Sequence, residues 1–152
     1  MNTVKVVDYD FNNGDGIAVT LWVAGCPHKC EGCHNPQLFN PNIGTNDIEG
    51  TIAKIKKGLS DTRVNKHLSI LGGEPLAPYN IKGVVKVVRE IRREFPDKEI
   101  WLWTGYQLDG LDAEQRKVLW CINYLIDGPF IKSKQVIGEW YGSSNQKIYE
   151  LV

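Results

Sequence analysis

Short apolar runs alternate along the chain with segments whose apolar residues recur every three or four positions. Four of the runs are rich in β-branched and aromatic residues and predict strands, over residues 17–24, 67–71, 100–103 and 122–126. The segments between them have helical spacing, which places helices between successive strands. Strands separated by helices are typical of parallel βαβ units, so the pattern predicts an α/β fold.

Three helices are expected from this periodicity. Ile48, Ile52, Ile55 and Leu59 form one apolar face, residues 80–95 form a longer helix that stops before Pro96, and a third helix runs from about Asp112 to Leu119. Asn46 and Glu49 are interpreted as a capping box for the first helix. The charged stretch from Arg89 to Arg93 is interpreted as the solvated face of the second helix.

Each predicted strand is followed by glycine, at Gly25, Gly72, Gly105 and Gly128. Sites in parallel α/β folds form at the carboxyl ends of strands, where glycine lets the backbone approach a ligand. The four glycines together predict one shared mouth, although each alone could simply turn the chain. A closed eight-fold barrel needs roughly 250 residues. We therefore expect residues 1–152 to form a single domain containing a partial (β/α) barrel.

The charge balance excludes some classes of partner. The chain has 18 Lys+Arg and 18 Asp+Glu, so it lacks the positive charge that attracts nucleic acids. No apolar run approaches the ~20 residues of a membrane span, and charged residues follow Met1 where a signal peptide would be apolar. Four cysteines are too few for a disulfide scaffold. We expect a cytoplasmic protein that binds neither nucleic acid nor membrane.

Three of the four cysteines, Cys26, Cys30 and Cys33, lie close together directly after the first predicted strand. Thiolates at this spacing on one loop favour a metal or iron–sulfur site over unliganded thiols. A zinc site completed by His34 or His28 is an alternative, but structural zinc sites usually take ligands from two separated segments. Cys121 lies in an apolar stretch and is interpreted as a small core residue.

The spacing C-x3-C-x2-C resembles the signature of the radical S-adenosylmethionine (SAM) enzymes. The resemblance implies that Cys26, Cys30 and Cys33 hold three irons of a 4Fe-4S cluster. The fourth iron is then left for the amino and carboxylate groups of SAM, which the reduced cluster cleaves to a 5'-deoxyadenosyl radical. The resemblance also fits the partial barrel.

Gly72-Gly73-Glu74-Pro75 closes the second predicted strand, where radical SAM enzymes bind the amino group of SAM. Glycine carbonyls and the carboxylate of Glu74 are suitable acceptors for an ammonium group. Gly32 departs from the family, which often has an aromatic residue before the third cysteine. Adenine contact is therefore expected from the backbone of Gly32 and Cys33 or from the ring of His34, which could otherwise be a solvated loop histidine.

Further segments resemble one branch of these enzymes, the activating enzymes of anaerobic (class III) ribonucleoside-triphosphate reductase. They are Asn13-Gly14-Asp15-Gly16 (with Asp15 where the family has proline), Trp101-Leu102-Trp103-Thr104-Gly105-Tyr106, Asp127-Gly128-Pro129-Phe130 and Gly142-Ser143-Ser144-Asn145-Gln146. Taken without the family, Thr104 to Tyr106 and Gly142 to Gln146 are ordinary turns. With the family, Thr104 joins Gly72, Gly73 and Glu74 as a predicted SAM contact.

This branch implies a defined reaction and defined partners. The deoxyadenosyl radical takes a hydrogen atom from one glycine Cα on the large subunit of the reductase and leaves a glycyl radical. A flavodoxin-like protein is the implied electron donor. The alternatives are a radical SAM enzyme with another substrate (another glycyl-radical enzyme, or a small molecule as in 7-carboxy-7-deazaguanine synthase) and a zinc-binding module without catalysis.

Overall fold

The computed structural model describes residues 1–151 and has one six-stranded sheet with its strands in sequence order. The strands are β1 (Thr3–Asp10), β2 (Ile17–Val23), β3 (Lys66–Gly72), β4 (Ile100–Trp103), β5 (Tyr124–Asp127) and β6 (Lys147–Glu150). β2 to β5 run parallel, which confirms the predicted α/β arrangement. β1 and β6, which the apolar pattern did not predict, add antiparallel edges.

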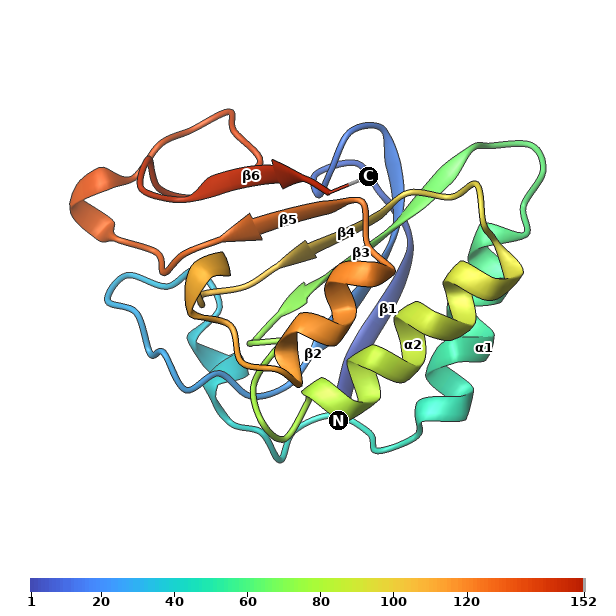
Figure 1. Cartoon of the computed structure of the whole chain (residues 1–152), viewed down its shortest axis with the longest axis horizontal. Coiled ribbons are helices and arrows are strands. Elements are labelled where there is room, and N and C mark those ends of the chain that lie inside the picture. The colour runs from blue at the N-terminus through green and yellow to red at the C-terminus, as the bar shows by residue number, and fades with distance from the viewer. Residues whose placement is uncertain (152) are drawn as a thin grey trace.

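The described part of the chain contains two α-helices, α1 (Ile48–Leu59) and α2 (Ile81–Glu94), both close to the predicted bounds. Four short 3-10 helices accompany them: η1 (Pro36–Phe39), η2 (Leu108–Gly110), η3 (Gln115–Trp120) and η4 (Lys132–Lys134). In Figure 1, α2 and η3 cross in front of the strands, with α1 beside α2. Within residues 1–151, no helix is long and apolar enough to cross a membrane.

The predicted helix over residues 112–119 is wrong in type and extent, because η3 is a 3-10 helix. Asp112 and Gln115 bond reciprocally: the Asp112 carboxylate accepts from the Gln115 amide at 2.8 Å, and the Asp112 amide donates to the Gln115 side chain at 2.9 Å. Gln115 also donates to the Leu76 carbonyl at 3.1 Å, which ties this turn to the segment after β3. The connection from β4 to β5 therefore contains no α-helix.

The capping box predicted from Asn46 and Glu49 is also wrong. Asp47 caps α1, because its carboxylate accepts from the Gly50 amide at 2.9 Å. Glu49 instead pairs with Lys86 of α2. The cap is thus shifted by one residue from the prediction, and its acidic partner serves to join the two helices.

The hydrophobic core lies between the helices and one face of the sheet. It contains the alternate strand residues Val19, Leu21, Val23, Leu68, Ile70, Ile100, Leu102 and Leu125, together with the apolar faces of α1 and α2. The residues between these point to the opposite face. There the ring of Trp101 stacks on those of Tyr124 and Trp103, with 4.2 Å and 6.0 Å between ring centroids. This aromatic face carries no α-helix in the described part of the chain.

The prediction that Arg89 to Arg93 is a solvated face holds only in part. Arg89 and Arg93 are exposed, but Arg92 is partly buried. Its guanidinium donates to four acceptors, the carbonyls of Pro96, Lys98 and Cys121 and the side chain of Asn123. Arg92 therefore joins the end of α2 to the entries of β4 and β5.

Candidate functional site

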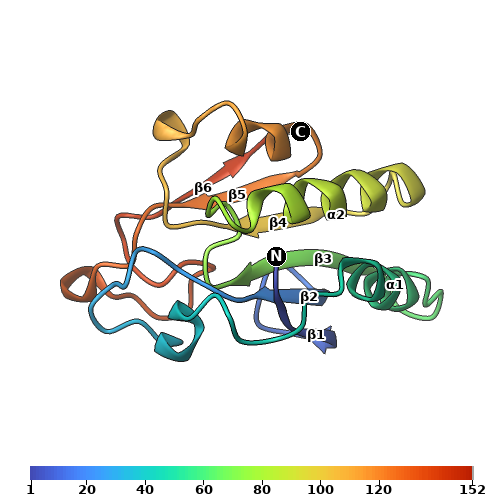
Figure 2. The ribbon, with the colours of Figure 1, turned by 90° about the horizontal axis from the view of Figure 1, so that it is seen from below.

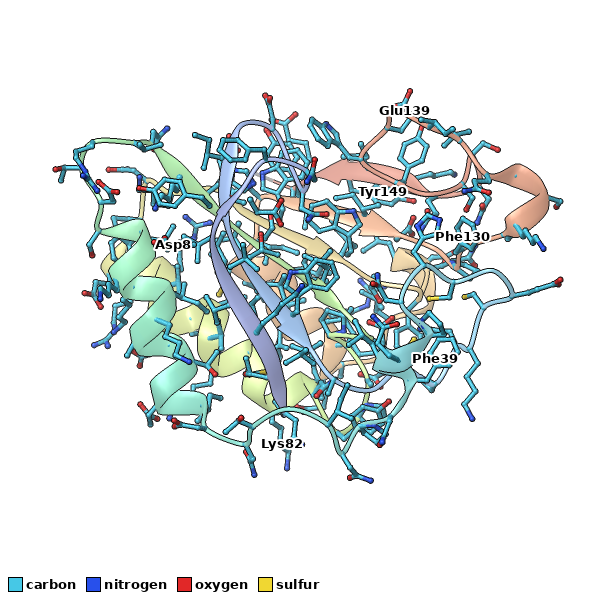
Figure 3. The ribbon with its side chains drawn as sticks, turned by 180° about the vertical axis from the view of Figure 1, so that it is seen from behind. Asp8, Phe39, Lys82, Phe130, Glu139 and Tyr149 are labelled. Atoms are coloured by element: carbon cyan, nitrogen blue, oxygen red, sulfur yellow. The ribbon has the colours of Figure 1, made fainter. Side chains whose placement is uncertain are left out.

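Residues 24–35, here called the cysteine loop, follow β2 at the end of the sheet where the parallel strands finish. In Figures 1 and 2 this blue-to-cyan segment lies at the same end as the orange-to-red segment between β5 and β6. In the view from behind, Phe39 and Phe130 both lie at this end, away from Asp8 (Figure 3). The predicted shared mouth is therefore formed by segments far apart in the sequence.

The three cysteines of the loop are half-buried and form no disulfide. The Cys33 sulfur accepts from the Asn35 amide at 3.4 Å. Burial raises the pKa of the Cys26 thiol, and hydrogen bonds from the amides of His28 and Lys29 act in the opposite direction. The loop thus directs backbone N–H groups at its sulfurs, which is how proteins stabilise cluster thiolates.

Three cysteines on one loop are a donor set suited to an iron–sulfur cluster. Within residues 1–151, no three His, Cys, Asp or Glu side chains gather around a position for one metal ion. A zinc ion needs four ligands at about 2.0–2.3 Å from one centre. In an iron–sulfur cluster, by contrast, each thiolate binds a different iron, so the three sulfurs need not converge on one point.

Cys121 cannot complete this set, because it precedes β5 whereas the cysteine loop follows β2. The two strands run in the same direction within the sheet, so these positions lie at opposite ends of it. Cys121 is half-buried and packs against the hydrophobic core. Its position agrees with the interpretation as an apolar residue.

The parallel register brings the cysteine loop against the turn after β3. Val23 lies opposite Gly72, and the chain continues this pairing with the Gly73 amide donating to the Val23 carbonyl at 2.9 Å and the Glu74 amide to the Gly25 carbonyl at 2.7 Å. An added Cβ at Gly73 would lie 2.3 Å from the Gly25 oxygen. Glycine at position 73 is therefore required by a close approach of two backbones.

The side chain of Asn80 joins the same two segments by hydrogen bonds. Its side chain, 1% exposed, donates to the carbonyl of Ala24 at 2.8 Å and to the carbonyl of Glu74 at 3.0 Å. Both acceptors are main-chain groups at the edge of the site, and the Glu74 carbonyl also accepts from the Ala77 amide at 3.2 Å. Sequence reasoning did not identify Asn80, which it treated only as the first residue of a helix.

Glu74 is buried, with 1% of its surface exposed. Its carboxylate accepts four hydrogen bonds, from the Leu76 amide (2.9 Å), the Thr104 hydroxyl (2.7 Å), the Gly105 amide (2.7 Å) and the ring Nε2 of His28 (2.7 Å). We call these five residues the Glu74 network. It connects the cysteine loop to the ends of β3 and β4.

The ring of His28 is enclosed on two further sides. The ring of Tyr106 packs edge-on against the His28 ring, with 4.6 Å between ring centroids. An added Cβ at Gly105 would lie 2.5 Å from the Cδ2 atom of His28. Burial, and next the charge of Glu74, raise the pKa of Tyr106. Tyr106 is thus held as a neutral phenol against the imidazole.

A cavity of about 360 Å³ opens beside the cysteine loop, within the ~300–1,000 Å³ typical of small-molecule sites. Five of the predicted SAM-contacting residues line it: Cys33, His34, Gly72, Gly73 and Thr104. Gly32 and Glu74 do not; Gly32 lies under the Lys132 side chain. The cavity's remaining walls include Asn13, Trp22, Trp103, Phe130, Trp140, Gly142 and Gln146.

Some of these lining residues could be identified from the sequence and others could not. Trp103 and Gln146 belong to the segments that resemble the activating enzymes. Gln146 accepts from the amides of Gly142 and Ser143 and donates to the Gly128 carbonyl at 2.8 Å, so the turn before β6 is anchored at the end of β5. Trp22 and Trp140 gave no such signal, because an isolated tryptophan in a sequence can belong to a hydrophobic core as well as to a binding site.

A larger hollow, of about 460 Å³, lies away from the cysteine loop beside Asp8, Tyr9 and Asp61. Three of its polar lining residues have partners, since the Tyr9 hydroxyl donates to Asp61 at 2.6 Å and Asp8 pairs with Lys66 at 2.8 Å. It contains no cysteine. The cavity beside the cysteine loop, which includes Cys33 in its lining, is therefore taken as the candidate site.

Known proteins resemble this chain over nearly its full length. A family model described as a 4Fe-4S single cluster domain matches residues 12–149. The chain is 41% identical to the anaerobic ribonucleoside-triphosphate reductase-activating protein of Escherichia coli K12, over 99% of both chains. Proteins of the same name are 41% identical in Vibrio cholerae (98% of this chain, 97% of the relative) and 36% identical in Enterobacteria phage T4 (98% and 94%).

Proposed function

Because the chain belongs to the family of anaerobic ribonucleoside-triphosphate reductase-activating proteins, we propose that it generates a glycyl radical on that reductase with a 4Fe-4S cluster and SAM. The observation that carries the proposal is the cysteine loop, with three thiols and no fourth, opening beside a cavity at the strand ends. When bound, the cluster supplies the electron that cleaves SAM to the radical that takes a hydrogen atom from glycine.

The protein's own residues divide into two sets. Cys26, Cys30 and Cys33 hold the cluster, and backbone amides of the loop donate to the sulfurs of Cys26 and Cys33. Three thiolates would bind three irons of the cluster, and the fourth iron would then be left for the amino acid end of SAM.

The second set encloses SAM. Cys33, His34, Gly72, Gly73 and Thr104 line the cavity that SAM would occupy. Gly32 and Glu74 do not line the cavity. Gly32 precedes the lining residue Cys33, and Glu74 is hydrogen-bonded to Thr104, which lines the cavity. Aromatic side chains, those of Trp22, Trp103, Phe130 and Trp140, also line this cavity.

The fold suits a protein substrate. We propose that the sheet is a partial (β/α) barrel of the radical SAM type and that residues 1–152 form one domain. The helices pack on one face, and the opposite aromatic face is where a glycine-bearing loop of the large reductase subunit would enter. We further propose a flavodoxin-like electron donor and action in the cytoplasm.

Anaerobic reconstitution with iron and sulfide tests the proposal. A chain loaded with a 4Fe-4S cluster, mixed with the reductase, SAM and a reductant, should give the electron paramagnetic resonance (EPR) signal of a glycyl radical. Cleavage of SAM without that signal, at verified cluster loading, would indicate another substrate. A colourless protein that holds one zinc and no iron would instead establish a zinc-binding module.

Substitution of the cysteines makes this test residue-specific. Cys26→Ala, Cys30→Ala and Cys33→Ala should each abolish SAM cleavage, because each removes one cluster ligand. Cys121→Ala is the matched control and should retain cleavage, since Cys121 lies at the other end of the sheet. A folded Cys121→Ala protein without a cluster would contradict the ligand assignment.

A further inference from the structure

The Glu74 network leaves no room on its carboxylate for another donor. The two oxygens of a carboxylate offer about four lone-pair sites. Oε1 accepts from Leu76 and Thr104, and Oε2 accepts from His28 and Gly105. Glu74 is also absent from the cavity lining, although Gly72 and Gly73 are part of it. An ammonium group could reach this carboxylate only by displacing one of four short hydrogen bonds.

His28 gives the network a second function, because it lies between two cluster cysteines. The loop around it has little regular structure, and Lys29 next to it has a left-handed backbone with φ of +49°. The side chain of His28 is 18% exposed, and its Nε2 is bonded to a carboxylate that lies 46 residues further along the chain. This bond ties the middle of the Cys26–Cys30 segment directly to the ends of β3 and β4.

We propose that His28 and Glu74 are positioning residues that hold the cysteine loop in place for the cluster, and that the Glu74 carboxylate does not bind the ammonium group of SAM. The part that concerns the loop rests on the hydrogen bonds alone. The part that concerns SAM rests on the proposed function. The expectation that Glu74 acts as an ammonium acceptor is replaced by this role.

Four variants test the loop's attachment. Glu74→Gln places an amide –NH2 against N–H donors, His28→Ala removes the donor from the loop, and His28→Gln keeps a donor of similar reach. Glu31→Gln is the matched control, because it makes the same carboxylate-to-amide change at an exposed position of the same loop.

The first readout is amide hydrogen exchange of the full chain, followed by mass spectrometry of peptides covering residues 26–34 and 103–106. We expect about tenfold faster exchange in both peptides for Glu74→Gln and His28→Ala. His28→Gln should recover part of the protection, and Glu31→Gln should match the wild type. Equal exchange in His28→Ala and Glu31→Gln would overturn the proposal.

The second readout uses the reconstituted protein and separates the two roles of Glu74. For Glu74→Gln we expect iron release to a chelator, without SAM, to be about tenfold faster. The SAM concentration that half-shifts the EPR spectrum of the remaining reduced cluster should stay within about threefold of the wild type. Unchanged iron release with a tenfold weaker SAM response would instead make Glu74 the ammonium ligand.

The two readouts also keep this proposal apart from the proposed function. A wild-type chain that takes up no cluster would end the proposed function, whereas amide exchange would still decide whether the network holds the loop. If Glu74→Gln does not fold, the comparison of His28→Ala with His28→Gln decides the same question, because both changes lie in the loop and outside the core.

Discussion

Gly73→Ala tests whether the close approach of the two strand ends sets the stability of the site. The new Cβ would lie 2.3 Å from the Gly25 oxygen and 2.8 Å from its carbonyl carbon, so the backbone at Gly25 must retreat by about 1 Å to reach ordinary contact. That movement breaks the 2.7 Å bond from the Glu74 amide to Gly25. Overpacking destabilises the folded state by ~1–3 kcal/mol, and the lost hydrogen bond by ~1 kcal/mol. Alanine also reduces the conformational entropy of the unfolded chain, which offsets ~0.4–1 kcal/mol of this loss.

We therefore expect Gly73→Ala to lower the free energy of unfolding by about 2–3 kcal/mol. Urea unfolding of the cluster-free chain, followed by circular dichroism, measures it. Gly110→Ala is the control, because an added Cβ there meets no atom within 4 Å, and it should be neutral or stabilising by up to ~1 kcal/mol. If the two variants differed by less than about 0.5 kcal/mol, the close approach would not be a determinant of stability.

Three further outcomes are expected in the same urea assay. Asn80→Ala should lower the free energy of unfolding by about 1–2 kcal/mol, because the Ala24 and Glu74 carbonyls each lose one hydrogen bond, although the Glu74 carbonyl keeps the one from the Ala77 amide. Burial lowers the pKa of His67, so the unfolded chain takes up a proton that the folded chain resists. Stability should therefore fall as the pH drops below ~6.5, by at most ~1.4 kcal/mol per pH unit, and His67→Phe should flatten that slope. Arg92→Ala should lower the free energy of unfolding by about 2–3 kcal/mol, because four hydrogen bonds from its guanidinium are lost. Arg93→Ala loses only an exposed pair with Glu90 and should change the free energy of unfolding by less than ~0.5 kcal/mol. Similar losses in the two variants would refute this reasoning.

The periodicity of the sequence predicted the elements that bury a regular face. β2 to β5, α1 and α2 each place apolar residues in the core, so their patterns are strong. β6 was missed because its residues are mostly exposed. β1 was missed because Lys5, Asp8 and Asp10 interrupt its apolar residues, and its pairing with β2 is irregular. Edge strands bury less surface, so their sequences carry a weaker pattern.

The site shows the same division between local and long-range information. The spacing of Cys26, Cys30 and Cys33 is visible in the sequence because the three residues share one loop. The partner of His28 is not, because Glu74 approaches only through the parallel pairing of β2 and β3. Gly72-Gly73-Glu74-Pro75 was correctly singled out as a strand end, but a motif says nothing about which donors surround a carboxylate.

The Glu74 network also has a consequence for how the protein is made. His28 is synthesised 46 residues before Glu74, and Gly105 follows Glu74 by 31 residues. At ~5–20 residues per second, the ribosome adds Gly105 about 4–15 s after His28. During that interval the Glu74 network is incomplete. The cysteine loop therefore gains all of its supports only in a chain that has already completed β4.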